Sequence, residues 1–538
     1  MAAYLKQQLI AYLGNKRLLL PFLGRLFEQR ASMNAGRRGV FLDPFAGSGA
    51  VARLARTLGF EVHANDWETY SWVINRAFLT LTPREAQDLF TSRGGLEKVL
   101  SELNALKEPR EEVVALHYAP RETQNPRPGE RLFYTRENAL FLDAVRERLE
   151  DDYGPEMGDP KVLLLALLLY EASVHSNTSG VFKGFHAGYG GHSGDALTRI
   201  LSPMQLEVPE LWDSPFPAFA FCQDALEFVR RRSAEVCYLD PPYNQHQYGS
   251  NYHLLNTVAR GDRPIAERVA GIRPDWKETR SPFCSRKTSS ATLCSLLDAV
   301  DARTLVVSYN TEGVIDFEEL HELLATRGRV TLEVQDYVVY RGGRQSPSRR
   351  AHNLEFALVV DTGARESGLS RARVERFLAE KRLVPLLKGR FHPQRLRSAF
   401  DGGGTDLQVA GRVLPTWKLY QISEVPNWAS WLDVDLKALE VGLTASQFNA
   451  PNEEAEVLYS LLDQETSAPK RRALEVRLLQ VLRRLAFAKY RTQLENALLQ
   501  LEQHLARQPS PRLHNGLQSL RVLYSRRSAP LESELQFI

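Results

Sequence analysis

An acidic, proline-rich turn that follows an apolar segment is the first stretch whose residues could do chemistry. Residues 235–239 are mostly apolar and lead into Asp240, Pro241, Pro242 and Tyr243. Because proline has no N–H and cannot extend a central strand, we expect a buried strand that stops here. In open α/β sheets, ligands bind at the carboxyl ends of strands. The turn would offer a carboxylate and a carbonyl to an amino group, and a tyrosine ring that stacks on a flat ring.

A glycine-rich turn near the N-terminus predicts a site for a nucleoside-type cofactor. An apolar segment, residues 39–42, leads into this turn, and a predicted helix over 50–59 follows it. Glycines let backbone amides approach a ligand, and a helix N-terminus favours negative charge. A second predicted strand ends in Asp66, about 20 positions after Gly47, where an acid meets ribose hydroxyls in nucleotide-binding folds. The turn consists of Asp43, Pro44, Phe45, Ala46, Gly47, Ser48 and Gly49.

The type of cofactor follows from what this turn contains and lacks. It has no third glycine at the position used by the GxGxxG dinucleotide motif, and Asp43 and Phe45 precede its glycines. The pattern suits a cofactor with a nucleoside and an amino acid but no phosphate, which is S-adenosylmethionine. Asp224 ends a third predicted strand, where it would bond the cofactor's adenine amine, cap the helix over 225–231, or do both.

Two further regions can be interpreted either as purely structural or as functional. Residues 173–192 interleave glycine, aromatic and amide residues. They form either an ordinary loop or a surface that meets a polar polymer, with aromatic rings for stacking and amides for hydrogen bonds. A closing strand pair is predicted over 330–340 and 354–360. Between these strands, the basic segment 341–350 is either a solvated hairpin tip or a loop that contacts phosphates.

Composition limits the class of protein. The 538 residues predict two or three domains, and a net charge of +3 hides local asymmetry. Four scattered cysteines without CxxC spacing predict neither a zinc site nor a disulfide framework, so we expect no metal. The N-terminus lacks a signal-peptide pattern, and the apolar run 162–170 is too short to span a bilayer. We therefore expect a cytoplasmic protein with no membrane partner.

The first ~360 positions together resemble the Dam-like, D12 class of amino-group DNA methyltransferases. Four features carry the resemblance: Tyr12-x-Gly-Asn-Lys, Asp43-Pro-Phe-x-Gly-Ser-Gly, the strand-end acid Asp66, and Asp240-Pro-Pro-Tyr. The resemblance implies an α/β fold, with a Rossmann-like methyltransferase sheet covered by helices on both faces. It also implies a recognition insertion, and an additional, mostly helical C-terminal domain is predicted from leucine periodicity.

The expected domain division follows the same order of features. Residues 1–80 and 216–364 would form the catalytic domain that uses S-adenosylmethionine, interrupted by a target-recognition insertion over 81–215. A basic mixed domain or linker is expected over 365–432 and a helical domain over 433–538. Double-stranded DNA is the implied substrate and a cognate restriction endonuclease a candidate partner, with nucleoid association through DNA. The oligomeric state is left open.

The resemblance also implies roles for individual residues. Asp240, Pro241, Pro242 and Tyr243 would be catalytic, with the amine held by the carboxylate and the Pro241 carbonyl while Tyr243 stacks on a flipped base. Asp66 would bind the ribose and Asp224 the cofactor's adenine. The remaining expected cofactor contacts are Tyr12, Asn15, Lys16, Asp43, Pro44, Phe45, Gly47, Ser48 and Gly49. The expected DNA contacts are Asn177, Lys183, Phe185, Tyr248, Arg341, Arg344, Arg349 and Arg350.

Several functions remain open at this point. Adenine N6 is favoured over cytosine N4 as the methylated amine, because the motif begins with aspartate. RNA or protein-glutamine methylation is disfavoured by the same aspartate and by the long insertion. A non-catalytic DNA-binding subunit is disfavoured by intact Gly47, Gly49, Asp66 and Asp240. A NAD-dependent oxidoreductase is the most distant alternative.

Overall fold

The computed structural model forms two compact units, Met1–Ser370 and Arg371–Ile538. The predicted basic loop with Arg341, Arg344, Arg349 and Arg350 lies outside the described residues. The finer domain division expected from the sequence stays a prediction. The structure describes residues 3–528 except 32–37, 107–110, 191–195, 265–268, 311–312, 336–354, 365–375, 378, 381, 384–385, 388, 401–405, 410–411, 418–420, 423–430 and 486–490.

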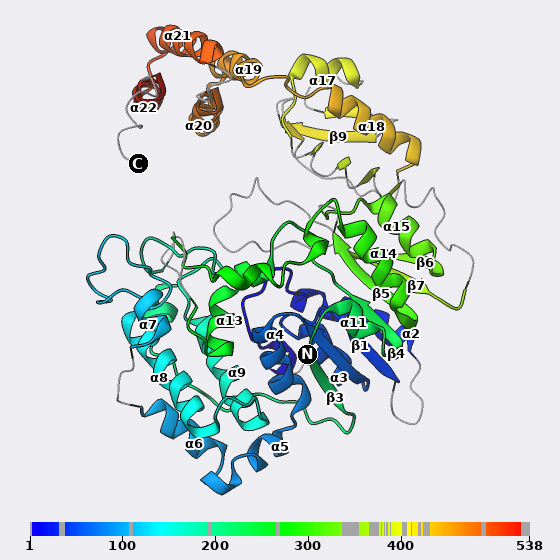
Figure 1. Ribbon diagram of the computed structural model, residues 1–538. Helices are drawn as coiled ribbons and strands as arrows, with labels where there is room; N and C mark the ends of the chain where they lie inside the picture. The colour runs from blue at the N-terminus through cyan, green and yellow to red at the C-terminus, as the bar shows by residue number, and fades with distance from the viewer. Residues whose placement is uncertain are drawn as a thin grey trace. The chain divides into compact units, whose positions relative to one another are not determined.

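A seven-stranded sheet organises the first unit, in the order β3-β2-β1-β4-β5-β7-β6 (Figure 1). Strands β1 to β5 run parallel, and β7 is antiparallel to both of its neighbours. The predicted α/β fold and largely parallel sheet are thereby confirmed. The chain winds outward in both directions from β1 and β4, so the topological switch point lies between these two strands. The strands are β1 Val40–Asp43, β2 Glu61–Asp66, β3 Ala218–Cys222, β4 Ser233–Leu239, β5 Asp301–Asn310, β6 Arg329–Gln335 and β7 Glu355–Asp361.

Both faces of this sheet are buried. On one face, Phe41, Val62 and Tyr238 pack in one core with α2 (Leu20–Arg30) and α3 (Ala50–Thr57). The alternate strand residues, such as Leu42 and Cys237, are also fully buried and point to the opposite face. Parallel strands buried on both faces are expected to be continuously apolar, as these are. Helices α11 (Ala225–Val229), α14 (Ser289–Ala299) and α15 (Phe317–Ala325) contact one another in series, and α15 contacts β6 and β7.

The reversed strand β7 determines where the basic segment is attached. Gln335, the last residue of β6, pairs with Glu355, the first residue of β7, and Glu355 pairs with Asn310 at the end of β5. Both ends of the segment 336–354 are therefore anchored at the carboxyl edge of the sheet, the edge at which β4 leads into Asp240.

The predicted insertion over 81–215 is mostly helical and contributes to a large core. This core includes α4 (Thr69–Asn75) and α13 (His253–Arg260), which lie outside the insertion. Helix α9 (Asp159–Val174) is buried almost all round, which explains its long apolar run. Among the described residues, no helix is long and apolar enough to cross a membrane. The insertion helices are α5 Pro83–Asp88, α6 Leu96–Asn104, α7 Val113–His117, α8 Arg136–Tyr153, α9 Asp159–Val174 and α10 Leu197–Leu201.

Two separate cores build the second unit. Strands β8 (Asp406–Val409), β9 (Arg412–Trp417) and β10 (Gln421–Ile422) form an antiparallel sheet. One core joins Leu407 and Ile422, from β8 and β10, to Leu436 of α18, and another joins α19 to α22. The division between the cores therefore falls between α18 and α19. The helices are α17 Pro393–Ala399, α18 Asp433–Ala445, α19 Pro451–Gln464, α20 Ala468–Leu485, α21 Arg491–Arg507 and α22 Pro511–Ser528.

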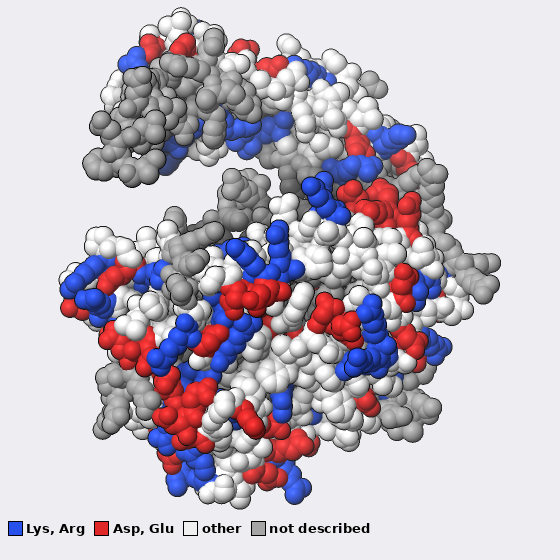
Figure 2. Space-filling model, in the orientation of Figure 1, with Lys and Arg blue, Asp and Glu red and all other residues white. Residues whose placement is uncertain are grey.

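The visible surface carries charges of both signs. On the face shown in Figure 2, groups of Lys and Arg side chains and groups of Asp and Glu side chains lie interspersed among uncharged residues. Many of them form ion pairs, as Arg93 does with Glu102 and Asp152. The small net charge of the chain therefore results from mixing of charges, and a site with cations alone stands out against this background.

Candidate active site

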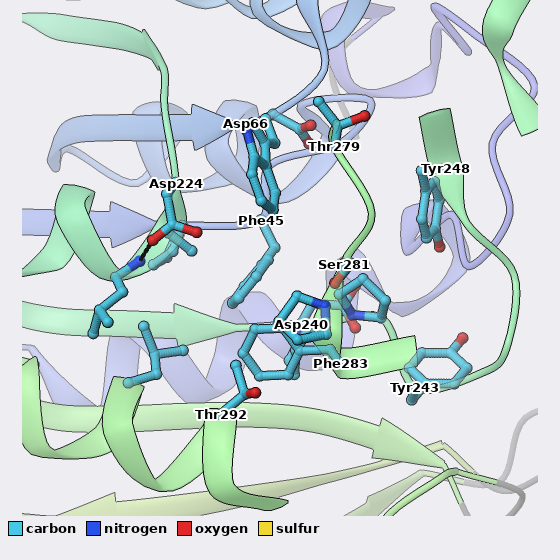
Figure 3. A pocket seen from close by; sticks show the side chains of 18 of the residues that line it. Phe45, Asp66, Asp224, Asp240, Tyr243, Tyr248, Thr279, Ser281, Phe283 and Thr292 are labelled. Carbon is cyan, nitrogen blue, oxygen red and sulfur yellow. Dashed lines mark hydrogen bonds between the residues drawn. The ribbon is translucent and has the colours of Figure 1, made fainter. Parts of the chain in front are cut away.

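A cavity of about 530 Å³ lies at the switch point of the sheet (Figure 3). The residues that follow β1, β2, β3 and β4 line it from one side, and residues between 279 and 296, among them Ser281, Phe283 and Thr292, line it from the other. Its size is that of a small-molecule site. The cavity brings together the glycine turn, both strand-end acids and the proline turn: Tyr12, Pro44, Phe45, Asp66, Asp224, Asp240, Pro241, Pro242, Tyr243 and Tyr248 all line it.

The glycine turn is held in shape by the acid at the end of β2. Asp66 accepts a hydrogen bond from the Gly47 amide at 2.8 Å through Oδ2, and one from the Glu68 amide at 2.9 Å through Oδ1. The Gly47 carbonyl accepts from Ser71 Oγ at 2.6 Å and from Asn75 Nδ2 at 3.1 Å. Gly47 has φ +50°, a left-handed conformation that glycine adopts without strain. Asp66 therefore fixes the turn in addition to its predicted contact with a ribose.

A residue that the sequence did not single out ties two strand ends together. Asn65 donates through Nδ2 to the carbonyls of Pro44 and Gln223, and its Oδ1 accepts from the Gln223 amide. The side chain is 2 % exposed, so these bonds are shielded from water. Asn65 thus sets the spacing between the glycine turn and Asp224. It directly precedes Asp66, but nothing in its local pattern marks it as a bridge.

The N-terminal segment reaches the site by packing on tyrosines. The Tyr12 ring stacks on Tyr248 and on Tyr252, with centroids 5.1 Å apart in each pair. The Leu13 amide donates to Tyr252 Oη at 2.7 Å, and Tyr248 Oη donates to the Leu13 carbonyl at 3.1 Å. Tyr12 also covers Gly47, where an added Cβ would lie 2.6 Å from Tyr12 Cε1. The tyrosine stack therefore clamps residues 12–14 over the glycine turn.

Lys16 faces the acid of the proline turn. Its Nζ lies 3.2 Å from Asp240 Oδ1 and 5.2 Å from the centroid of the Tyr243 ring. The lysine side chain is 4 % exposed, so it is screened little by solvent. The resemblance implied that Lys16 contacts the cofactor, and the anionic group that Lys16 faces in the structure is Asp240. Asn15 shapes this turn, because its Oδ1 accepts from the Arg17 amide at 2.9 Å. The contact of both residues with the cofactor stays a prediction.

Tyr243 is oriented by the neighbouring strand. Its ring packs edge-on against Tyr309 of β5, with centroids 5.7 Å apart, and its carbonyl accepts from the Val314 amide at 2.9 Å. On the opposite side of the cavity, the Phe45 ring meets Phe283 edge-on at 5.4 Å. Two aromatic walls therefore enclose the space in front of Asp240 (Figure 3). Phe283 belongs to a segment that the sequence did not single out.

Asp43 and Asp224 have distinct environments. Asp43 is 1 % exposed, and burial and the nearby Asp240 carboxylate raise its pKa well above the ordinary value. Asp224 caps α11, because its Oδ1 accepts from the Leu226 and Glu227 amides at 2.9 and 3.3 Å. Asp224 also lines the cavity. Its capping role is therefore present, while its bond to an adenine amine stays a prediction.

The insertion residues that were predicted to contact DNA differ in how exposed they are. Asn177 is 0 % exposed, and its amide nitrogen donates to the carbonyls of Leu132, His186 and Gly188. It therefore holds the loop together from inside and does not lie on a surface that DNA reaches. Composition could not show this, because inward and outward amides look alike in a sequence. Phe185 is half-buried against Phe133, while Lys183 is exposed.

His253 takes the structural role that a lone histidine most often has. It is fully buried, and its Nε2 bonds the Phe182 carbonyl at 2.8 Å. Burial lowers its pKa to about 4. It therefore anchors the insertion loop to α13 and does not act as a base in the cavity.

Glu68 is a buried acid of the cavity that the sequence did not single out. It is 3 % exposed, and its Oε2 accepts from Asn256 Nδ2. Burial raises its pKa to about 7 from an ordinary 4.5, and the bond from Asn256 opposes this shift. The folded protein thus retains this proton between pH 4.5 and 7, while the unfolded chain releases it.

Stability should therefore fall as pH rises through this window. The contribution of Glu68 is fully present below pH 4.5 and is lost by about pH 7, which amounts to roughly 3 kcal/mol. We expect Glu68→Gln to flatten this part of the pH dependence in urea unfolding at pH 5, 6 and 7. The exposed Glu207→Gln is the matched control. Equal slopes for wild type and the Glu68 variant would show that the proton is not retained.

Fold and site together are those of a methyltransferase-type α/β enzyme, in which residues of the glycine turn share one cavity with the Asp240 carboxylate. Residues 12–321 match the family described as D12 class N6 adenine-specific DNA methyltransferase. The chain belongs to this family. The resemblance inferred from the four motifs is thereby confirmed.

Individual relatives are similar over about two thirds of the chain. The Type II methyltransferase M.NlaIII of Neisseria lactamica is 30% identical over 348 residues, 64% of this chain and 96% of that protein. M.CviAII of Paramecium bursaria Chlorella virus 1 is 28% identical over 329 residues, covering 61% and 91%. The modification methylase StsI of Streptococcus sanguinis is 27% identical over 353 residues, and the match spans only 51% of that protein.

Proposed function

We propose that the chain transfers a methyl group from S-adenosylmethionine to N6 of an adenine that has been extruded from duplex DNA. The observation that carries this proposal is the position of Asp240, beside Lys16 and in the wall of the cavity that the glycine turn lines. The family description supplies adenine as the base. The names of the relatives support a place in a Type II restriction-modification system, with a cognate endonuclease as partner.

The cavity fits this cofactor. Asn65 and the strand-end acids Asp66 and Asp224 form the polar wall expected for a nucleoside, and Phe45 and Phe283 supply flat apolar walls. A narrow hollow lined by Asn15, Lys16 and Gly47 adjoins Asp240 and would receive the amino-acid end. When bound, S-adenosylmethionine supplies an electrophilic methyl group.

The protein's own residues account for the activation of the amine. The lone pair of an adenine amine is delocalised into the ring, so the amine is a poor nucleophile. Hydrogen bonds to the Asp240 carboxylate and the Pro241 carbonyl would draw the nitrogen toward tetrahedral geometry and free this lone pair. Lys16 holds the carboxylate in place before the base arrives. Tyr243 stacks on the extruded ring, so most of the rate gain comes from positioning and preorganised electrostatics.

The direct test is transfer of a labelled methyl group from S-adenosylmethionine to plasmid DNA by the purified chain. Single-molecule sequencing of DNA from cells that express the chain would then identify both the base and the recognition site. We expect N6-methyladenine at one short sequence. Tight binding of DNA without transfer to any duplex would contradict the proposal and favour a non-catalytic subunit.

A further inference from the structure

A second cavity, of about 610 Å³, adjoins the cavity at the switch point of the sheet, which we call the cofactor cavity. Lys287 lines both of them, and Thr279, Ser281, Pro282 and Phe283 of the same segment line the first. The second cavity has five basic side chains in its lining and no carboxylate: Lys183, Lys277, Arg280, Arg286 and Lys287. We call this group the basic cavity. Its charge is of one sign, unlike the mixed surface seen in Figure 2.

These five cations are available for an external ligand. All five are exposed, and no ion pair joins any of them to another described residue. Asp275, an acid of the same segment, already pairs with Arg260 at 2.9 Å and with Arg273 at 2.6 Å. Glu278 is exposed but does not line the cavity. The local positive charge is therefore uncompensated within the described part of the protein.

The segment that carries four of these cations is held firmly. Gln247, just after the proline turn, donates to the Ser281 carbonyl at 3.1 Å and accepts from the Ser281 amide at 2.8 Å. Thr288 Oγ1 donates to the Pro282 carbonyl at 2.6 Å. Arg273, 3 % exposed, anchors the start of the segment through Asp262 and Asp275. The cations are thus presented from a fixed backbone that is tied to the catalytic turn.

The basic cavity joins the insertion to the catalytic segment. Lys183 comes from the loop of the insertion, whereas Arg280 comes from the segment after the proline turn. Both lie close enough to Cys284 for their positive charges to lower the pKa of its thiol, against the larger effect of burial. Neutral donors complete the lining, among them Gln245 and Ser285. Lysine, arginine, amide and hydroxyl groups are the set with which proteins contact phosphate oxygens.

We propose that the basic cavity binds the DNA backbone phosphates that flank the extruded nucleotide. The proposal rests on the proposed function, and it deepens that function by locating the DNA strand at the mouth of the catalytic cavity. A phosphate held here would leave its nucleotide facing the cavity that contains Asp240 and Tyr243. Phosphate contacts fix register without reading sequence, so this site would act on every duplex alike.

The test is the salt dependence of DNA binding by the full chain. The variant carries Lys277→Gln, Arg280→Gln and Arg286→Gln, which leaves Lys287 in the cofactor cavity untouched. The probe is a fluorescent duplex of about 30 base pairs with arbitrary sequence, titrated over a range of NaCl concentrations. Each lost phosphate contact lowers the slope of log K against log salt by about 0.9, so we expect a reduction of about 2.7.

The matched control neutralises three exposed cations away from the site: Arg84, Lys98 and Arg231, each to Gln. Its slope should equal that of wild type, and both variants should keep wild-type cofactor binding and thermal unfolding. An unchanged slope in the cavity variant, or an equal loss in the control, overturns the proposal. Methyl transfer by wild type is measured in parallel: a normal rate with an unchanged slope refutes the basic cavity alone, whereas absence of transfer refutes the proposed function.

Discussion

Asp240→Asn is expected to lower kcat for methyl transfer by at least ~10²-fold, the effect of removing one preorganised charge-stabilising group from an active site. The asparagine keeps the shape of the side chain but removes the charge that accepts from the substrate amine. Binding of S-adenosylmethionine, measured by calorimetry, should be nearly unchanged, because the glycine turn is held by Asp66 and not by Asp240.

The controls for this variant address folding and charge. The substitution removes the carboxylate that faces the buried Lys16, so thermal unfolding must be measured beside activity. Asp213→Asn, an exposed change of the same type, should leave activity, cofactor binding and unfolding at wild-type values. Loss of cofactor binding in the Asp240 variant would mean that the proline turn holds the cofactor and not the base.

Gly47→Ala is expected to weaken S-adenosylmethionine binding by about 10–100-fold and to lower the free energy of unfolding by roughly 1–3 kcal/mol. Two causes act together. An alanine at φ +50° is strained, and its Cβ would lie 2.6 Å from Tyr12 Cε1, which forces the stacked ring away from the turn. Isothermal titration with the cofactor and urea unfolding would measure the two effects.

Gly129→Ala separates these two causes. Gly129 also has a positive φ, +91°, but no atom lies within 4 Å of an added Cβ. This control should therefore show the backbone strain alone, with a small loss of stability and unchanged cofactor affinity. If both alanine variants bind the cofactor like wild type, the turn at Gly47 does not form the cofactor site.

The catalytic strands and their terminal motifs could be predicted because they depend on local rules. Prolines end β4, apolar residues run continuously through buried parallel strands, and the distance from Gly47 to Asp66 reflects one strand-turn-helix-strand unit. The types of these motifs and their order along the chain were sufficient to predict the family. The D12 class match over residues 12–321 confirms that inference.

The contacts that complete the site depend on long-range packing, and no local pattern reveals them. Lys16 meets Asp240 across 224 positions of sequence, and Asn65 bridges to Gln223. The segment with Phe283 has no periodicity, so only the fold brings it against Phe45. Asn177 illustrates the converse error, because its polar type suggested a surface contact although its amide satisfies three buried carbonyls.

The reversed strand β7 also decides how freely the connection between β6 and β7 can vary in length. It pairs with β5 on one side and β6 on the other, so the ends of segment 336–354 are neighbours in the sheet. Doubling the length of such a closed segment costs only about 0.6 kcal/mol of closure entropy. The connection between β6 and β7 can therefore change in length while β4 and Asp240 stay in register, so that variation at this corner of the sheet leaves the catalytic turn in place.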